Sequence, residues 1–199
     1  MKMTVPCAIF PHMGVVLGLA MLGVPFGCRP DAKEPGDRKM TLEITSSALT
    51  QGHPIPKKYT GEGADVSPPL AWSGVPEGTK ELALICDDPD APTKEPWVHW
   101  VLYKIPVSVT ELPEGLPRKA RPKAPPGVLQ GKNSWPAAEA TGYRGPMPPP
   151  GHGVHHYYFK LYALDTSLEV EPGLDKRALI EKIRDHVLAE DALMGTYQR

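Results

Sequence analysis

The sequence predicts a mainly β protein, an antiparallel β-sandwich with one α-helix near the C-terminus. Three observations support this class. Several apolar runs have the length and composition of strands, and they do not alternate with helical segments. The only strongly helical pattern comes late in the chain. The 25 prolines and 19 glycines are spread between the apolar runs, as expected for turns in a loop-rich β fold.

Residues 1–27 are predicted to be an export signal. Lys2 gives a minimal positive start, and residues 13–26 are mostly apolar. This apolar run is short for a membrane-spanning helix, which needs about 20 residues. The chain is therefore expected to be exported to the cell envelope.

Cys28 is the candidate lipidation site. A glycine directly before a cysteine at the end of such a segment is similar to a bacterial lipoprotein signal, although Pro25 and Phe26 depart from that pattern. Two or more acyl chains on Cys28 would anchor the protein to the membrane, facing the periplasm. Cleavage without acylation and an uncleaved anchor remain alternatives. Residues 28–39 are charged and lack aliphatic side chains, so they are expected to be a tether.

The folded domain is expected to span residues 40–199. A half-exposed strand is predicted at 41–46 from its alternation of apolar and polar residues, and a short strand within 59–72. The run at 82–86 has the aliphatic content of a buried strand, and a second strand is expected at 97–105.

The C-terminal half contains the clearest strand and the helix. Residues 155–164 are rich in aromatic side chains, which favours a strand. A short strand is possible within 128–135. Asp175 is predicted to cap a helix that runs to about residue 189, and residues 191–199 to add a last short helix or strand.

Charge and cysteine content exclude some functions. The 22 Lys and Arg residues nearly balance the 23 Asp and Glu residues, so no overall field favours nucleic acid. Only Cys86 lies inside the predicted domain, so no disulfide is expected there. A thiol within an apolar strand is more often inert than nucleophilic.

A polar site is predicted where the strand at 82–86 ends. Asp88 and Asp90 follow it, separated and followed by prolines that stiffen the backbone. His99 stands near the start of the next strand. Because unpaired buried carboxylates are costly, this grouping favours a polar site over the alternative of a solvated, charged hairpin tip.

A second candidate segment precedes the aromatic strand. It is rich in Gly and Pro, carries His152, and leads into His155 and His156. Alternation along the strand sends His155 and Tyr157 to one face. His156 and Tyr158 then point to the other face, so only one of the two pairs can face a pocket. A lone histidine at a strand start is more often structural, which is the alternative for this segment.

Together these residues resemble the phosphatidylethanolamine-binding proteins, which include the Raf kinase inhibitor proteins and their bacterial relatives. The resemblance rests on Asp-Pro-Asp-Ala-Pro at 88–92, Trp-Val-His-Trp at 97–100, Gly-Pro-Met-Pro-Pro at 145–149 and Gly-Val-His-His-Tyr at 153–157. Residues 162–165 and 186–189 further suggest the bacterial branch.

The resemblance implies a large antiparallel sheet packed on a smaller one, and a small anion pocket. The pocket residues implied are Asp88, Asp90, Pro92, Trp97, His99, Gly145, Pro146, His155 and Tyr157. The family usually has Arg after the pocket histidine, and His156 stands there instead, which should weaken any salt bridge from that position. The function implied is non-enzymatic binding of phosphate or a phosphorylated lipid head group, with no cofactor.

The chemistry expected of this site is hydrogen bonding to an anion. A protonated His99 or His155 could donate to phosphate oxygens, and the acids could orient the imidazoles or accept protons from a partly ionised ligand. Affinity is therefore expected to rise between about pH 8 and pH 6, around the reference histidine pKa of about 6.5.

Three other functions remain open from the sequence. His99, His152, His155 and Asp88 are zinc-type ligands, although their spacing matches no recognised metal motif. Asp88 and His155 could act as an acid-base pair in a hydrolase, although no Gly-x-Ser-x-Gly elbow is present. Some relatives inhibit enzymes, so the protein could inhibit a protease or other envelope enzyme, bind a protein partner, or form a homodimer.

Overall fold

The computed structural model describes residues 41–199. The predicted export signal at 1–27, the tether at 28–39 and the lipidation site Cys28 lie outside the described residues. Within residues 41–199, no helix has the length and apolar character needed to cross a membrane.

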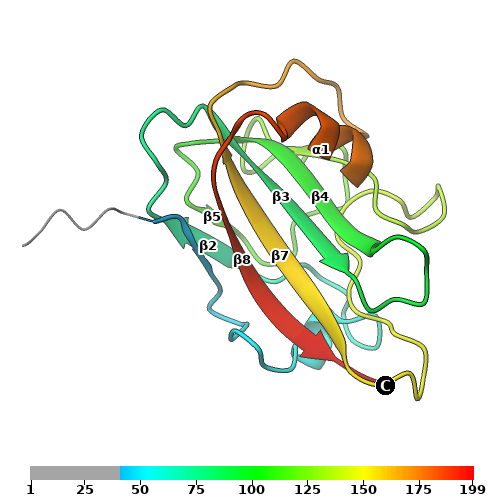
Figure 1. Ribbon diagram of the computed structural model, residues 1–199. Helices are drawn as coiled ribbons and strands as arrows, with labels where there is room; N and C mark the ends of the chain where they lie inside the picture. The colour runs from blue at the N-terminus through cyan, green and yellow to red at the C-terminus, as the bar shows by residue number, and fades with distance from the viewer. Residues whose placement is uncertain (1–40) are drawn as a thin grey trace, which may run out of the picture. The chain divides into compact units, whose positions relative to one another are not determined.

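Two antiparallel sheets form the domain, as predicted (Figure 1). The larger has the strand order β6-β4-β3-β7-β8, and the smaller has the order β1-β2-β5. The large sheet consists of β3 (Glu81–Asp88), β4 (Trp97–Pro106), β6 (Leu129–Gln130), β7 (His155–Leu164) and β8 (Val187–Tyr197). The small sheet consists of β1 (Glu43–Thr45), β2 (Leu70–Ser73) and β5 (Glu111–Leu112); a 3-10 turn, η1 (Lys57–Tyr59), and one helix, α1 (Lys176–Ile183), complete the described elements.

The main core lies between the two sheets. Strand β3 is central in the large sheet and is buried along its whole length, which explains its continuous apolar run. The buried side chains on the inner face include Trp100, Tyr143 and Phe159. On the outer face, Leu179 and Ile183 of α1 join a second apolar cluster.

The helix is shorter than the sequence pattern predicts. Asp175 caps it as expected, since its Oδ1 accepts a hydrogen bond of 2.8 Å from the backbone N–H of Ala178. The predicted end near residue 189 is wrong: α1 ends at Ile183, and Val187 begins β8. Val187 and Leu188 follow the helical spacing, but pairing with the long strand β7 overrides it. Residues 191–199 continue β8 to Tyr197, so the strand alternative is confirmed.

Asp87 joins α1 to the sheet. Its carboxylate is buried and forms ion pairs with Lys160 of β7, at 2.8 Å, and with Lys176 at the start of α1.

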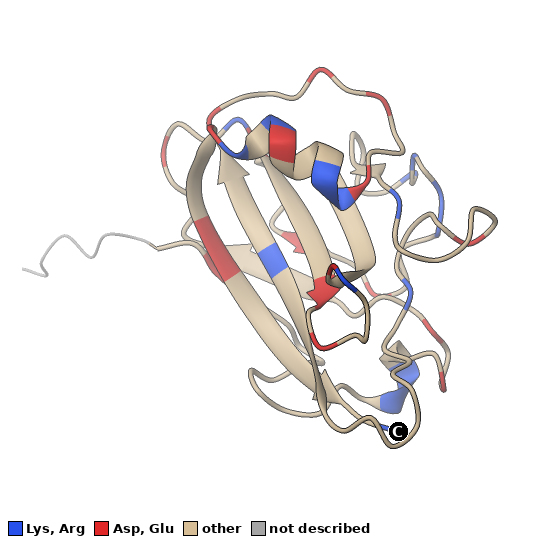
Figure 2. Cartoon of the chain, turned by 45° about the vertical axis from the view of Figure 1, so that its right-hand side comes forward, with Lys and Arg blue, Asp and Glu red and all other residues tan. Residues whose placement is uncertain are grey.

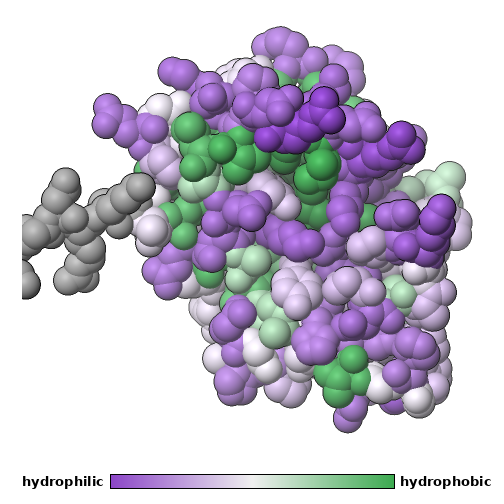
Figure 3. All heavy atoms as spheres, in the orientation of Figure 1, coloured by the Kyte–Doolittle hydropathy of each residue, from purple (hydrophilic) through white to green (hydrophobic). Residues whose placement is uncertain are grey.

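Figure 2 shows that most charged residues lie on α1 and in the loops, while the large sheet carries few. On the face shown in Figure 3, the largest group of hydrophobic atoms lies in the upper half, beside α1.

The register brings the predicted site residues to one end of the large sheet. Asp88, at the end of β3, pairs with Trp97 at the start of β4. The next position inward, Asp87, pairs with Tyr158 of β7. Antiparallel neighbours therefore place the end of β3 beside the starts of β4 and β7, and His99 and His155 lie at the same end of the sheet.

Candidate functional site

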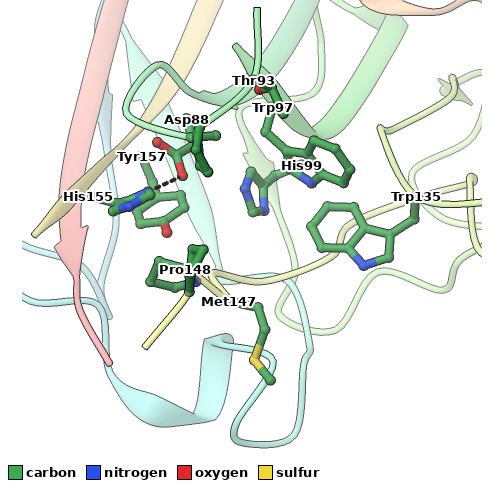
Figure 4. Close-up of a pocket in the computed structure, with 12 residues that line it drawn as sticks. Asp88, Thr93, Trp97, His99, Trp135, Met147, Pro148, His155 and Tyr157 are labelled. Carbon is green, nitrogen blue, oxygen red and sulfur yellow. Dashed lines mark hydrogen bonds and ion pairs between the residues drawn. The ribbon is translucent and has the colours of Figure 1, made fainter. Parts of the chain in front are cut away.

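A cavity of about 280 Å³ opens at this end of the large sheet (Figure 4). Its lining comes from the end of β3, the starts of β4 and β7, and the loops around them. The lining residues are Asp88, Ala91, Pro92, Thr93, Trp97, His99, Trp135, Met147, Pro148, Pro149, His155 and Tyr157. Six of the nine predicted site residues are therefore brought together: Asp88, Pro92, Trp97, His99, His155 and Tyr157.

Asp90 does not line the cavity, contrary to the expectation. The Asp88 Oδ1 accepts a hydrogen bond of 2.8 Å from the backbone N–H of Asp90, which closes a tight turn at the end of β3. This turn directs Asp90 outward, where its Oδ2 lies 2.7 Å from Nδ1 of His156. His156 thus contacts the outer carboxylate and not the cavity.

Gly145 and Pro146 also lie outside the cavity lining, and they support the loop that forms it. A Cβ on Gly145 would lie 2.3 Å from the carbonyl oxygen of Tyr59, so this backbone packs against η1. The Gly145 N–H donates to Asp65 at 2.6 Å, and the carbonyl of Pro146 accepts from Gly61 at 2.9 Å. These contacts position the lining residues that follow directly in the chain, Met147, Pro148 and Pro149.

Asp88, His155 and His152 form a hydrogen-bonded chain. The carboxylate Oδ2 of Asp88 lies 2.7 Å from Nδ1 of His155, and both side chains are buried. An ionised carboxylate only accepts, so Nδ1 of His155 carries the proton and its Nε2 is an acceptor. His152 Nδ1 lies 2.8 Å from that Nε2 and donates to it. Both nitrogens of His155 are therefore engaged.

His99 is buried and neutral. Its Nδ1 donates to the carbonyl oxygen of Arg144 at 2.6 Å, which leaves Nε2 as an acceptor. Burial lowers the pKa of His99 to about 4, although the Arg144 carbonyl and the Asp88 carboxylate favour the charged form. The expectation that a protonated His99 donates to phosphate near neutral pH is therefore wrong, because desolvation outweighs both.

Tyr157 presents a buried hydroxyl without a partner. The residue is 1% exposed, and among residues 41–199 no group meets its Oη with full hydrogen-bond geometry. Burial raises the pKa of Tyr157, and the charge of the nearby Asp88 carboxylate, with an imperfect hydrogen-bond interaction from the hydroxyl to it, raises the pKa further, so the hydroxyl keeps its proton. An unsatisfied buried hydroxyl costs about 1–3 kcal/mol, which a ligand oxygen would recover.

The lining contains one carboxylate, that of Asp88, and no Lys or Arg side chain. The guanidinium of Arg144 lies outside, 5.3 Å from the ring centre of Trp135. Arg144 is itself paired with Asp65 at 2.9 Å and with Glu139. A negatively charged ligand in the cavity would therefore lie near the Asp88 carboxylate, and no Lys or Arg side chain of the lining would offset the repulsion between them.

The sequence did not identify the loop residues that complete the lining, above all Trp135. Its ring packs edge-to-face against Trp97, with 5.4 Å between ring centres, and against His99, at 5.0 Å. The short strand possible within 128–135 covers only Leu129–Gln130, and Trp135 lies in the loop that follows. A tryptophan in a Pro- and Gly-rich loop was the available signal.

The four candidate zinc ligands do not form one metal site. Among residues 41–199, no group of three or more His, Cys, Asp or Glu side chains is arranged to hold a metal ion. Cys86 is fully buried, and burial raises the pKa of its thiol, which disfavours a nucleophilic thiolate.

Comparisons with known proteins give one consistent result. Residues 45–198 match the family model described as phosphatidylethanolamine-binding protein. A "UPF0098 protein" from Methanothermobacter thermautotrophicus is 48% identical over 158 residues, covering 79% of this chain and 99% of the relative. A similarly named protein from Pyrococcus horikoshii is 41% identical over 185 residues, covering 93% of this chain and 85% of the relative.

Two solved structures are also similar. Escherichia coli YbcL, described as a member of the mammalian PEBP family, has a TM-score of 0.73 and 35% identity, covering 79% of this chain and 98% of that protein. The phosphatidylethanolamine-binding protein homologue CT736 from Chlamydia trachomatis has a TM-score of 0.70 and 40% identity, covering 80% of this chain and 99% of that protein.

Proposed function

Because the chain belongs to the phosphatidylethanolamine-binding protein family, we propose that its cavity binds a small phosphorylated anion, or a phosphorylated lipid head group, without catalysing a reaction. The observation that carries this proposal is the unpartnered hydroxyl of Tyr157, buried at a cavity that also contains the acceptor nitrogen of neutral His99. The cavity thus offers a donor and an acceptor to one ligand.

The donor and acceptor together favour a ligand that still carries a proton. The Tyr157 O–H donates to a phosphoryl oxygen, and the His99 Nε2 accepts from a P–OH group. The Asp88 carboxylate repels any anion at short range, and it repels a dianion about twice as strongly as a monoanion. The monoanion of a phosphate monoester meets all three conditions better than the dianion does.

The first test varies pH with two ligands. The second pKa of a phosphate monoester is about 6, so the monoanion fraction rises roughly 50-fold between pH 8 and pH 6. Calorimetric affinity for methyl phosphate is expected to rise by a similar factor, while methyl sulfate, which has no proton to lose in this range, should bind weakly and show no trend. An equal rise in affinity for both anions would show that a group of the protein, and not the ligand, takes up the proton. Absence of methyl phosphate binding at every pH would refute anion binding.

The second test uses the hydroxyl itself. In Tyr157→Phe, affinity for methyl phosphate is expected to fall about tenfold, because a hydrogen bond to a charged ligand is lost. Stability of the free protein should rise by about 1 kcal/mol, because an unsatisfied hydroxyl is removed. Tyr158→Phe is the matched control, since this neighbouring side chain lies on the other face and does not line the cavity. Loss of binding in both variants would contradict the assignment.

We also propose that the protein acts in the cell envelope, held to the membrane through acylated Cys28. The support is the pattern of residues 1–28 alone. A membrane location would bring the cavity near lipid head groups. Inhibition of an envelope enzyme is the second function proposed for the protein at that location.

A further inference from the structure

Strand β8 leaves part of the edge of the large sheet open. It is last in the sheet order, so among residues 41–199 one other strand, β7, pairs along it. A crevice of about 520 Å³ lies between this edge and β1, the edge strand of the smaller sheet. We infer that the edge binds an extended, positively charged peptide segment of a partner protein, which adds a strand beside β8. None of the cavity-lining residues lies on β8, so this inference goes beyond the proposed function.

The hydrogen bonds of β8 show which backbone groups point to the open side. Thr196 donates to the carbonyl oxygen of His53 at 3.0 Å and accepts from the N–H of Ile55 at 2.8 Å, both on the side away from β7. Residues that point outward and inward alternate along an antiparallel strand, and the register with β7 has no shift between Thr196 and Glu190. The N–H and C=O groups of Glu190 and Ala192 therefore also point outward.

Only the C-terminal part of this edge is covered. Residues 51–55 lie along it, and the carbonyl oxygen of Met194 accepts from the N–H of Gly52 at 2.8 Å. Among residues 41–199, no hydrogen bond reaches the outward backbone groups of Glu190 or Ala192 from across the edge. Four backbone groups are thus available to an added strand, and such unpaired groups are where another chain pairs with a sheet.

Asp191 explains why β1 does not fill this gap. Its Oδ2 accepts a hydrogen bond of 2.8 Å from the backbone N–H of Ile44 in β1. The two edge strands are therefore connected through a side chain, while their backbones belong to separate sheets. This connection leaves the crevice between them.

The charge of the crevice favours a basic occupant. Its lining contains the carboxylates of Glu43 and Asp191 and no Lys or Arg side chain. Glu190 is exposed on the same strand, and Figure 2 shows the two acids of β8 as its red segment. A second copy of β8 that paired with Glu190 and Ala192 about a two-fold axis would place the two Asp191 side chains opposite each other, and like charges in that position destabilise a sheet. A strand with Lys or Arg side chains would meet opposite charges there, so charge favours a basic partner over a second copy.

The test is an NMR titration of the full chain with a synthetic peptide, acetyl-Lys-Val-Lys-Val-Lys amide, and with a matched peptide in which Glu replaces Lys. The Lys peptide is expected to protect the amides of Glu190 and Ala192 from hydrogen exchange, because they become donors to the added strand. The Glu peptide should bind about tenfold more weakly or not at all, because several cross-strand charge pairs are reversed. Affinity for the Lys peptide should fall as salt is raised.

Two substitutions at one position separate the backbone from the side chain. Ala192→Pro removes an N–H that points away from β7, so the ladder with β7 keeps its donors. Affinity for the Lys peptide is expected to fall about fivefold or more, because a hydrogen bond is lost. Ala192→Val keeps the N–H and should bind as the wild type does. Should Ala192→Pro fold poorly, Glu190→Lys must weaken binding of the Lys peptide and strengthen binding of the Glu peptide.

Four results would overturn the inference: no binding of the Lys peptide, equal affinity for the two peptides, wild-type affinity in Ala192→Pro, or binding that leaves the amides of Glu190 and Ala192 unprotected. Protection of these amides without peptide would also overturn it. The edge would then belong to a second copy of the chain if sedimentation shows a dimer, and to residues 1–40 if it shows a monomer. Methyl phosphate binding is measured separately, so failure of the peptide site and failure of the proposed function give different results.

Discussion

Replacing Gly145 with alanine is expected to lower the free energy of unfolding by about 3 kcal/mol or more. The added Cβ would lie 2.3 Å from the carbonyl oxygen of Tyr59 and 2.7 Å from Cα of Thr60. Both are backbone atoms, so no side-chain rotation relieves the clash, and overpacking at such sites lies at or above the usual cost of about 1–3 kcal/mol. Urea denaturation of the wild type and the variant measures the difference.

Gly61→Ala is the control for this prediction. There the nearest atom to an added Cβ is Sδ of Met147, at 2.9 Å. Because Met147 is flexible and 44% exposed, it can move aside, and the cost is expected to be below about 1 kcal/mol. Equal destabilisation by the two substitutions would show that Gly145 has no special role in packing the loop.

Acid is expected to destabilise the protein through His99, by about 3 kcal/mol between pH 7 and pH 4. The pKa of His99 is lowered to about 4 in the folded state by burial, against about 6.5 when unfolded. Between these values the unfolded chain binds more protons, so stability falls as pH falls through this window and is fully present above about pH 6.5. A difference of about 2.5 pKa units corresponds to about 3 kcal/mol.

The measurement compares unfolding free energies of the wild type and His99→Gln from pH 7 to pH 4. Gln keeps an N–H donor for the Arg144 carbonyl and does not titrate, so the variant should lose this much less stability over the range. Other titrating groups are common to both proteins and largely cancel in the difference. If the unfolding free energies of the two proteins fall in parallel as the pH is lowered, the folded protein tolerates a charged His99.

The sequence was informative wherever one strong physical preference decided the outcome. The buried run of β3, the aromatic strand β7 and the Asp175 cap all follow local rules, and all three are present. Alternation along β7 correctly placed His155 and Tyr157 on one face. The meeting of His99 and His155 at one cavity was implied by the family resemblance and by no local rule.

The failures come from interactions that local patterns do not contain. Val187 and Leu188 suit a helix by spacing, but Val187 pairs with Leu164 of β7, a strand distant in sequence, and Leu188 lies at the adjoining register shift. Asp90 is two residues from Asp88, and only the turn closed by its own N–H directs it outward. The charge state of His99 depends on how completely the fold removes it from water, which composition does not report.

The neighbouring carboxylates Asp87 and Asp88 have a consequence for how the protein can change. Successive strand residues point to opposite faces, so Asp87 meets Lys160 and Lys176, while Asp88 meets His155. One carboxylate therefore holds α1 to one face of the sheet, and the other holds His155 at the cavity on the opposite face. Mutations among the lysines would change how firmly the helix is attached, and they would reach the cavity through the charge of Asp87, which acts on His99.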